Sequence, residues 1–454
     1  HLCDRRQRQM CIRDSLKSRC CIQTQGGITV TVIIEKRSRL IHCKFHIRSI
    51  GRNLLRRHSR NQSRCGVVDH NAVGTDYSTP VARLIHRIGV HNIAAVRIQR
   101  KSAVFSSLEA PLQFLQLNPP PCFFDEVQRV PEIFRALKII VDSRSDKGLY
   151  WLSGSQKLSL MSQVSDALPG RLMNFELWPF SIYEIAGKGL EQKPYLPSFS
   201  LSSSLPILAP EDTWNAVFQG FWPELKEATE TERSWFFRSL VDLYLSRDVR
   251  SLSGIEKFDE FEKFLITIAR RVGQELRLQE IAKEVGVSQP TIKRWLSIAE
   301  ASGIIHFLRP YAHNIGKQLV KSPKLYFTDT GLVCHLLNLQ NGKELSNSYL
   351  AGNIFENFVV NEVKKSWAHN GKEANFFFFR DNTGMEIDLI IHAQGKYSCV
   401  EIKSKTSPDA HDAKWLKKAE DLLPDLAKNA SVVCMTEKTY PLSPSIVAHS
   451  IWQI

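Results

Sequence analysis

Two acids and a lysine near the C-terminus have a spacing that suits metal-dependent chemistry. Asp388 precedes Glu401 by 13 residues, and Glu401 begins the tripeptide Glu-Ile-Lys that ends at Lys403. If residues 394–395 form a two-residue hairpin turn, opposite residues have numbers that add up to 789. Asp388 then faces Glu401, and Glu386 faces Lys403. Two acids and a lysine therefore converge on one spot, and carboxylate oxygens are ligands that divalent cations prefer.

The same register sorts the hairpin into two faces, because side chains alternate along a strand. One face carries Glu386, Asp388, Glu401 and Lys403, and the other carries Ile387, Leu389, Ile391, Val400 and Ile402. A structural alternative also fits this pattern. In it, Glu386 and Lys403 form a cross-strand salt bridge, and Asp388 is merely solvated. The pattern alone leaves both interpretations open.

A second acid pair, Asp125–Glu126, follows the short hydrophobic run Cys-Phe-Phe. Strand, turn and amphipathic helix are predicted over 120–143, and a second strand over 148–156. Functional groups at the carboxyl ends of such strands are typical of doubly wound α/β folds. The alternative for an acid pair in this place is a helix N-cap with a solvated acid.

Residues 277–308 have the pattern of a helix-turn-helix. Gly286 permits the turn, Ser288 caps the second helix, and Pro290 lies in its first turn. The apolar positions expected inside are Ile281, Ala282, Val285, Ile292, Trp295, Leu296 and Ile298. The outward positions, which a DNA-reading helix would use, are Gln289, Thr291, Lys293 and Arg294. A purely structural role is an equal alternative, because two cations are few for phosphate binding.

Charge is distributed unevenly along the 454 residues. Residues 1–104 contain 21 Lys+Arg and 5 Asp+Glu, whereas the other 350 contain 39 and 41. The first segment shows neither paired zinc ligands nor a lasting helix or strand period. We expect it to be aberrant basic sequence, from a wrong reading frame, or disordered, rather than a nucleic-acid-binding arm or a zinc module. Its charge then says nothing about partners.

The stretches FFDEVQRVPE, LSGSQ, ALPGRL, LWPFSIYEI and YLSRDVRSL resemble a prokaryotic AAA-type P-loop ATPase family with a C-terminal domain of unknown function. The resemblance implies that Asp125 orients Mg²⁺ and that Glu126 polarises the attacking water. It also implies that Ser155 or Gln156 senses the γ-phosphate, and that Arg171 contacts phosphate or a neighbouring subunit. The Gly-x-x-x-x-Gly-Lys-[Ser/Thr] loop that cradles phosphates is absent from the sequence. ATP hydrolysis by this chain is therefore not expected.

The hairpin resembles the restriction-endonuclease-like PD-(D/E)xK fold. The resemblance implies that Asp388 and Glu401 bind Mg²⁺ and that Lys403 positions a water. Glu356, on the helix predicted before the hairpin, matches an additional acid that some of those enzymes carry. Cleavage does not follow from the fold, because relatives can keep the scaffold without the activity.

The predicted fold class is α/β in several domains. We expect an aberrant segment over 1–104, and a truncated P-loop NTPase with a parallel sheet and flanking helices over 105–189. A linker and helical lid-like region (190–255), a winged helix (256–340) and a nuclease-like α/β domain (341–454) follow. The expected function is that of a DNA-associated, AAA-family ATP-binding protein with impaired ATP binding. The alternatives are a Mg²⁺-dependent nuclease and a non-catalytic DNA- or protein-binding module.

Cofactors and partners follow from the same reasoning. ATP and Mg²⁺ are the cofactors that the family resemblance implies. The expected partners are DNA, a second copy of the chain or another protein. The longest apolar runs fall far short of the roughly 20 residues that cross a bilayer. We therefore expect no membrane partner and a cytoplasmic location.

Overall fold

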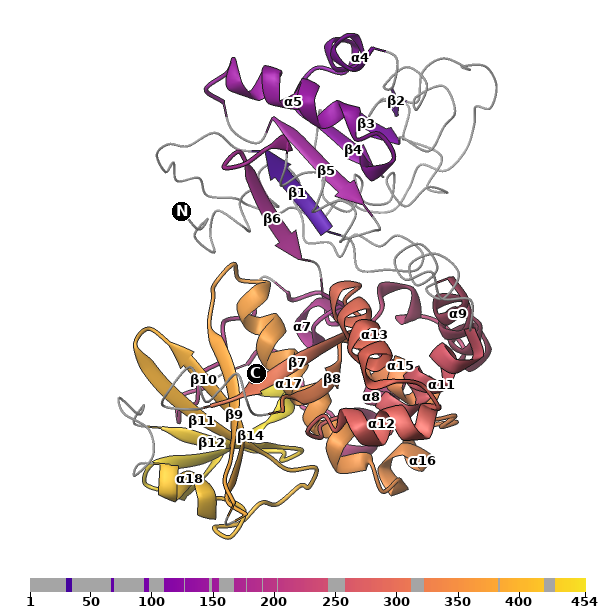
Figure 1. Cartoon of the computed structure of the whole chain (residues 1–454). Coiled ribbons are helices and arrows are strands. Elements are labelled where there is room, and N and C mark those ends of the chain that lie inside the picture. The colour runs from indigo at the N-terminus through magenta and orange to yellow at the C-terminus, as the bar shows by residue number, and fades with distance from the viewer. Residues whose placement is uncertain are drawn as a thin grey trace. The chain divides into compact units, whose positions relative to one another are not determined.

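The computed structural model contains two compact units, residues 1–177 and 178–454 (Figure 1). It describes residues 30–34, 67–68, 94–97, 110–125, 127–146, 149–154, 167–176, 178–189, 191–201, 203–243, 258–311, 322–382, 384–419 and 429–454. Within these ranges no helix is long and apolar enough to span a bilayer.

The N-terminal unit contains a six-stranded sheet of order β2-β3-β4-β5-β1-β6. Its strands are β1 Val30–Ile34, β2 Val67–Val68, β3 Ala94–Arg97, β4 Cys122–Asp125, β5 Tyr150–Gly154 and β6 Leu172–Glu176. β3, β4 and β5 are parallel, as predicted for the core of this unit. β1 runs antiparallel to β5 and β6, and β2 runs antiparallel to β3; both strands lie before the 105–189 range for which the parallel sheet was predicted.

Helices α4 (Pro111–Leu117) and α5 (Glu132–Asp142) accompany this sheet (Figure 1). A short 3-10 turn, η1 Val127–Arg129, joins β4 to α5. Ile133, Leu137 and Val141 of α5 are buried in the apolar core of the unit, which confirms the predicted helical spacing. Because the N-cap of α5 is Pro131, the acids at 125–126 do not cap this helix.

The C-terminal unit begins with a set of helices and with an irregular segment around Tyr195, which we call the strap. The helices are α7 Ile182–Ile185, α8 Pro210–Gln219, η2 Pro223–Leu225, α9 Glu230–Leu243, α11 Phe258–Ala269, α12 Leu278–Val285 and α13 Gln289–Ala301. Further along the chain come α15 Thr330–Leu336, α16 Gly342–Asn347, α17 Ala351–Ala368, α18 Lys414–Lys418 and η5 Ile451–Gln453.

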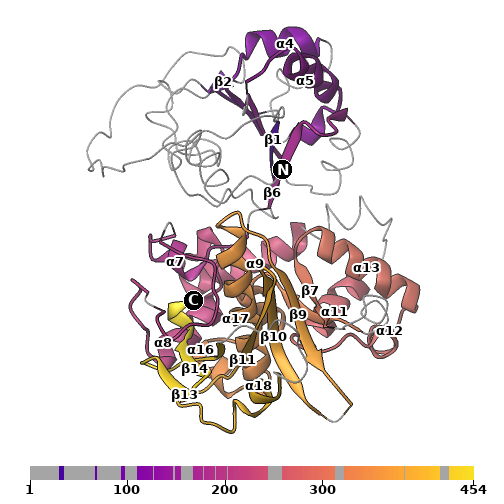
Figure 2. The ribbon, with the colours of Figure 1, turned by 90° about the vertical axis from the view of Figure 1, so that its left-hand side faces the viewer.

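An eight-stranded sheet of order β13-β14-β12-β11-β10-β9-β7-β8 runs through this unit (Figure 2). Its strands are β7 Ile305–Pro310, β8 Lys324–Phe327, β9 Asn375–Arg380, β10 Glu386–Ala393, β11 Lys396–Ile402, β12 Ala430–Cys434, β13 Tyr440–Ser443 and β14 Ile446–Ser450. β7 and β8 form the antiparallel pair expected after the second helix of the helix-turn-helix. β7 also pairs in parallel with β9, so this pair belongs to the C-terminal sheet.

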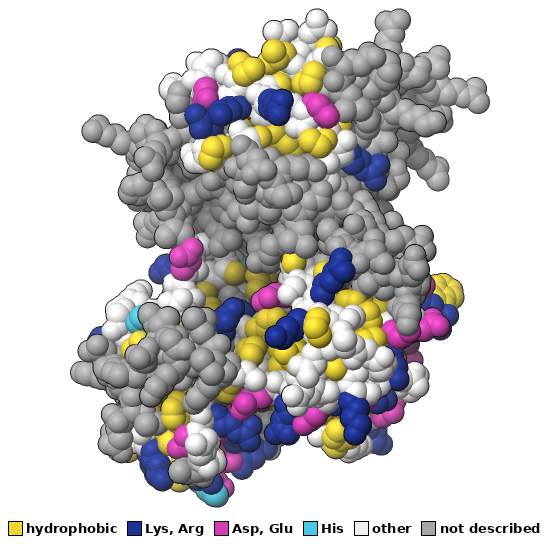
Figure 3. Space-filling model, in the orientation of Figure 1, with side chains coloured by type: hydrophobic (Ala, Val, Ile, Leu, Met, Phe, Trp, Pro, Cys, Tyr) yellow, Lys and Arg dark blue, Asp and Glu magenta, His cyan; other side chains and the backbone are white. Residues whose placement is uncertain are grey.

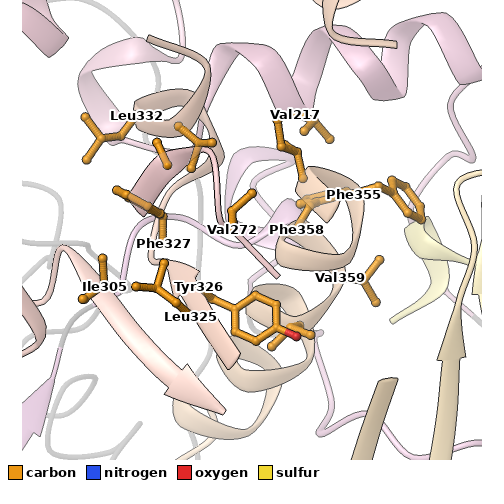
Figure 4. Packing of buried hydrophobic residues seen from close by; sticks show 14 of the residues in the cluster. Val217, Val272, Ile305, Leu325, Tyr326, Phe327, Leu332, Phe355, Phe358 and Val359 are labelled. Carbon is orange, nitrogen blue, oxygen red and sulfur yellow. The ribbon is translucent and has the colours of Figure 1, made fainter. Parts of the chain in front are cut away.

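One apolar core joins the predicted middle and C-terminal domains (Figure 4). Ile305 and Phe327, from β7 and β8, belong to the same buried cluster as Phe355 and Phe358 of α17. Each is at most 1% exposed. The boundary predicted at residue 340 therefore does not separate two independent cores.

The predicted linker after residue 190 is packed against the C-terminal sheet instead of being free. Tyr195 is 2% exposed, and its hydroxyl hydrogen-bonds Ser431 of β12 at 2.7 Å. Its backbone N–H donates to Ser366, and its carbonyl accepts from the Trp367 indole, both on α17. The Pro- and Ser-rich composition correctly indicated irregular backbone, but such backbone can be buried when side chains satisfy its polar groups.

Candidate functional site

The N-terminal unit places Asp125 at the carboxyl end of β4, as predicted. β4 lies between β3 and β5 with all three strands parallel, so their carboxyl ends share one edge of the sheet. The Asp125 side chain lies outside the described structure, as do Glu126, Ser155 and Gln156. The predicted nucleotide site therefore remains a prediction from sequence and strand order.

Arg171 is bound within its own unit. Its Nε and Nη2 donate to the two carboxylate oxygens of Asp142, at the C-terminal end of α5, the latter at 3.1 Å. Nη1 donates to the carbonyl oxygen of Pro169 at 2.9 Å. The Asp142 hydrogen bond raises the pKa of Arg171. A contact to phosphate, as predicted for Arg171, would have to compete with this bidentate pair.

The helix pair α12–α13 has the predicted local chemistry. Gly286 adopts the left-handed conformation with φ of 88°, and the Ser288 hydroxyl accepts from the Thr291 N–H. All seven apolar positions expected inside are buried. Gln289, Lys293 and Arg294 are exposed, while Thr291 is half-buried beside the cap. The geometry is that of a helix-turn-helix, and the helix whose residues were predicted to read DNA has a polar outer surface.

The hairpin β10–β11 has the predicted register. Leu389 pairs with Val400, and Ala393 with Lys396, both with numbers adding up to 789. Gln394 and Gly395 both have positive φ, as a two-residue turn of this type requires. The regular pairing stops at Leu389, and the carboxylate of Asp388 accepts a hydrogen bond from the Ile402 N–H at 2.8 Å.

A bulge in β10 changes one face assignment. On the other side of β10, Ile387 pairs with Phe379 and Ile390 with Phe377, so Asp388 and Leu389 together oppose the single residue Phe378. Ile387 therefore packs with Ile390 and Cys399 on the α18 side, while Leu389 remains on the α17 side. The prediction that Ile387 shares a face with Leu389 is wrong, because strict alternation fails at a bulge.

Asp388, Glu401 and Lys403 meet at the end of this hairpin. The Lys403 ammonium lies 2.6 Å from Glu401 Oε1 and 3.8 Å from Asp388 Oδ2. Burial, reinforced by the charge of Asp388, raises the pKa of Glu401 to about 8. Burial lowers the pKa of Lys403, but the neighbouring Asp388 and Glu401 outweigh it and raise that pKa overall.

Glu386 does not face Lys403, which excludes the predicted cross-strand salt bridge. Its Oε1 lies 2.7 Å from the ammonium of Lys324, and its Oε2 lies 3.7 Å from Arg380. Lys324 also lies 2.8 Å from Glu356 Oε1, which accepts from the Tyr326 hydroxyl at 2.6 Å. A second charged group, centred on Lys324, therefore adjoins the first.

A polar pocket of about 810 Å³ opens onto these groups. Lys324, Glu356, Glu386 and Asp388 line it, together with Glu280 of α12 and with residues between α11 and α12, namely Arg271, Gly273, Gln274, Glu275 and Arg277. Its remaining lining residues are Pro310, Ser322, Asn353, Phe378, Arg380, Asp381 and Asn382. The pocket thus lies between the predicted winged helix and the nuclease-like domain, inside one compact unit.

The predicted metal ligands were Asp125, Glu356, Asp388 and Glu401. No group of three His, Cys, Asp or Glu side chains in the described ranges is arranged to hold a metal ion. Glu356 Oε1 is engaged by Lys324 and Tyr326. Glu401 Oε2 is buried and has no hydrogen-bond partner there. Lys403 already neutralises Asp388 and Glu401, as Lys324 does Glu356, but Glu401 Oε2 remains an oxygen that could bind a further cation.

Lys324 and Tyr326 were not identified from the sequence as site residues. They lie at alternate positions of β8, so both point to one face, but the sequence of an isolated strand does not show what that face meets. A lysine in an otherwise apolar strand was the available signal, because lysine is almost never fully buried unless it is paired.

Three segments of the chain match models of known protein families. Residues 78–186 match the family described as "AAA domain". Residues 210–343 match "Domain of unknown function (DUF8612)", and residues 351–454 match "Domain of unknown function (DUF4143)". The matches support an AAA-type ATPase relationship. The AAA match begins at residue 78, within the segment predicted to be aberrant.

Two mycobacterial proteins are similar to most of the chain. They are Uncharacterized protein Rv2008c of Mycobacterium tuberculosis and Uncharacterized protein Mb2031c of Mycobacterium bovis. Each is 25% identical over 326 residues, which cover 71% of this chain and 67% of the relative. A crystal structure of protein VC1899 from Vibrio cholerae is 12% identical, covering 73% of this chain and 86% of that one, with a TM-score of 0.18. We infer nothing from a similarity at that level.

Proposed function

We propose that this chain is an ATPase-like protein whose C-terminal unit binds DNA and cleaves its phosphodiester bonds with the help of Mg²⁺. The supporting observation is the convergence of the buried Asp388 and Glu401 carboxylates on the Lys403 ammonium, with Asp388 lining a polar pocket. Two acids and a lysine form the donor set that such hydrolysis uses. The register that unites them is the one the sequence predicts.

The residues of the site have distinct tasks in this proposal. Asp388 and Glu401 would hold Mg²⁺, and the bound ion would polarise a phosphate oxygen. The Ile402 N–H fixes one oxygen of Asp388, and Lys403 fixes one oxygen of Glu401. Lys403 also lies at the distance from both acids at which its ammonium can orient a water. Its neutralising charge limits the repulsion between the two carboxylates.

In this proposal the N-terminal unit is related to ATPases but binds ATP poorly. The AAA match makes the unit ATPase-like, but each of the five Gly-Lys pairs in the chain lacks the Ser or Thr of a phosphate loop. We therefore propose impaired ATP binding. Equilibrium binding of a fluorescent ATP analogue tests this directly, and saturable binding at micromolar concentrations that is lost in Asp125→Asn would refute it.

A nuclease assay on the full chain tests the main proposal. Linear DNA is incubated with Mg²⁺ or with EDTA, and with wild type, Asp388→Asn, Glu401→Gln and the control Glu227→Gln. Glu227 is exposed and outside the pocket, so its variant should behave as wild type. Mg²⁺-dependent cleavage that falls at least a hundredfold in both site variants would support the proposal. Equal cleavage by all four proteins, or none by wild type, would sink it.

A second candidate function is non-catalytic DNA binding through α13. Its supporting observation is the exposure of Gln289, Lys293 and Arg294 on one helix. On the face shown in Figure 3, basic and acidic side chains of the C-terminal unit alternate without forming one basic field. Binding would therefore be modest. Salt-sensitive binding that disappears in Lys293→Ala/Arg294→Ala, and that survives in Glu401→Gln, would favour this candidate.

A further inference from the structure

The Lys324 side chain is more fully buried than is usual for a lysine. It is 3% exposed, and its ammonium lies 2.8 Å from Glu356 Oε1 and 2.7 Å from Glu386 Oε1. The three residues come from β8, α17 and β10, so segments far apart in sequence converge on one nitrogen. The Phe378 ring centroid lies 5.4 Å from the same nitrogen, within the range of a cation–π contact.

Three carboxylates line the pocket beside this position, and buried carboxylates require compensation. They are Glu356, Glu386 and Asp388, while Glu401, with 5% of its side chain exposed, pairs with Lys403. A buried charge without a partner is strongly destabilising, so a cation must accompany the group. Lys403 compensates Asp388 and Glu401, whereas Glu356 and Glu386 share Lys324.

We infer that Lys324 is a built-in cation, and that it occupies the place between Glu356 and Glu386 that a divalent metal ion would otherwise take. An ammonium has three donors and no acceptor, so it can bind two carboxylates at once as these distances show. The Tyr326 hydroxyl donates to the same oxygen of Glu356, which leaves that oxygen little room for a metal ion.

Electrostatics support this assignment. Burial alone would lower the pKa of Lys324, but Glu356, Tyr326, Asp388 and Glu386 together raise it well above its ordinary value. The ammonium therefore keeps its charge throughout the physiological range. A permanently charged lysine performs the neutralising task of a metal ion without depending on metal concentration.

The position of Lys324 limits where an added metal ion can bind. An added divalent ion should bind through Asp388 and Glu401 without using Glu356. Removal of the ammonium should open a second cation site between Glu356 and Glu386. The inference concerns cation occupancy, so it stands whether or not the C-terminal unit cleaves DNA.

Terbium luminescence tests the inference on the full chain, because excited tyrosine transfers energy to nearby Tb³⁺ and Tyr326 touches Glu356. Tb³⁺ titrations compare wild type with Lys324→Ala and with Lys324→Ala/Glu356→Gln/Glu386→Gln. The single variant should bind Tb³⁺ at least tenfold more tightly than wild type, or bind one more equivalent. The triple variant should lose that gain. A folded Lys324→Ala protein without any gain would overturn the inference.

A second variant keeps the inference testable if Lys324→Ala does not fold. Glu356→Gln retains the acceptor oxygen for Lys324 and Tyr326, so it preserves the network. Its affinity for Mn²⁺, measured by electron paramagnetic resonance, should stay within twofold of wild type. A tenfold or larger loss would show that Glu356 holds an external metal ion and would refute the built-in cation.

Discussion

Glu401 should make the stability of the C-terminal unit depend on pH in an unusual direction. Burial and Asp388 raise its pKa to about 8, above the ordinary value of 4.5. The folded protein therefore holds this proton more tightly than the unfolded chain does. The resulting stabilisation is fully present below pH 4.5 and is lost as the pH rises through about 8. Glu401→Gln, which resembles the protonated acid, should remove this dependence.

The structure sets the size of the effect. Each pH unit between the two pKa values corresponds to about 1.4 kcal/mol, so the full loss is on the order of 5 kcal/mol. This is an upper value, because interactions that remain in the unfolded chain reduce the difference between the two states. Such a difference would lower the melting temperature of wild type, relative to Glu401→Gln, by on the order of 10 °C.

Thermal unfolding from pH 5 to pH 8.5 measures the effect. EDTA is present throughout, so that no divalent ion competes with the proton, and the fluorescence of buried Trp367 and Trp452 reports on the core. Wild type and the exposed control Glu227→Gln should lose stability together as the pH rises, while Glu401→Gln does not. If wild type and Glu401→Gln follow parallel curves, the protonated state assigned to Glu401 is refuted.

The helix-turn-helix offers three further predictions, each measured as a change in urea unfolding midpoint. Gly286→Ala should cost about 1–2 kcal/mol, since φ is 88° there and no atom lies close to the added methyl group; an unchanged midpoint would contradict the left-handed turn. Ser288→Ala should cost about 1 kcal/mol through loss of the N-cap, and Ser288→Asp should restore most of it. Trp295→Ala should cost roughly 3–5 kcal/mol, because the indole packs edge-on against Phe261 and Phe264; a loss below 1 kcal/mol would refute that packing.

Local patterns predicted several features correctly because their causes are local. The positive φ values that residues 394–395 adopt set the hairpin register, and the register brings Asp388 and Glu401 together. Gly286 and Ser288 likewise define the α12–α13 turn from within. In each of these places, neighbouring residues determine the backbone conformation, so the sequence contains the information.

Other features depend on distant partners, and the sequence did not reveal them. The bulge at Asp388 becomes apparent only when β10 meets β9, whose pairing skips one residue. The role of the strap around Tyr195 depends on Ser366 and Ser431, more than 170 residues away. The AAA match begins at residue 78, so it overlaps the last part of the segment predicted to be aberrant.

The position of Lys324 changes how the C-terminal part of the chain should be divided. A boundary at residue 340 would assign Lys324 to a winged helix, and Glu356 and Glu386 to a nuclease-like domain. The three side chains form one ion-pair group, and β7 pairs directly with β9. A fragment that starts at residue 341 would lose the cation, two strands of the sheet and part of the apolar core, while keeping the acids that need them. The strand pair β7–β8 is therefore a structural component of the acidic site, and a change that displaces β8 would alter the charge balance beside Asp388.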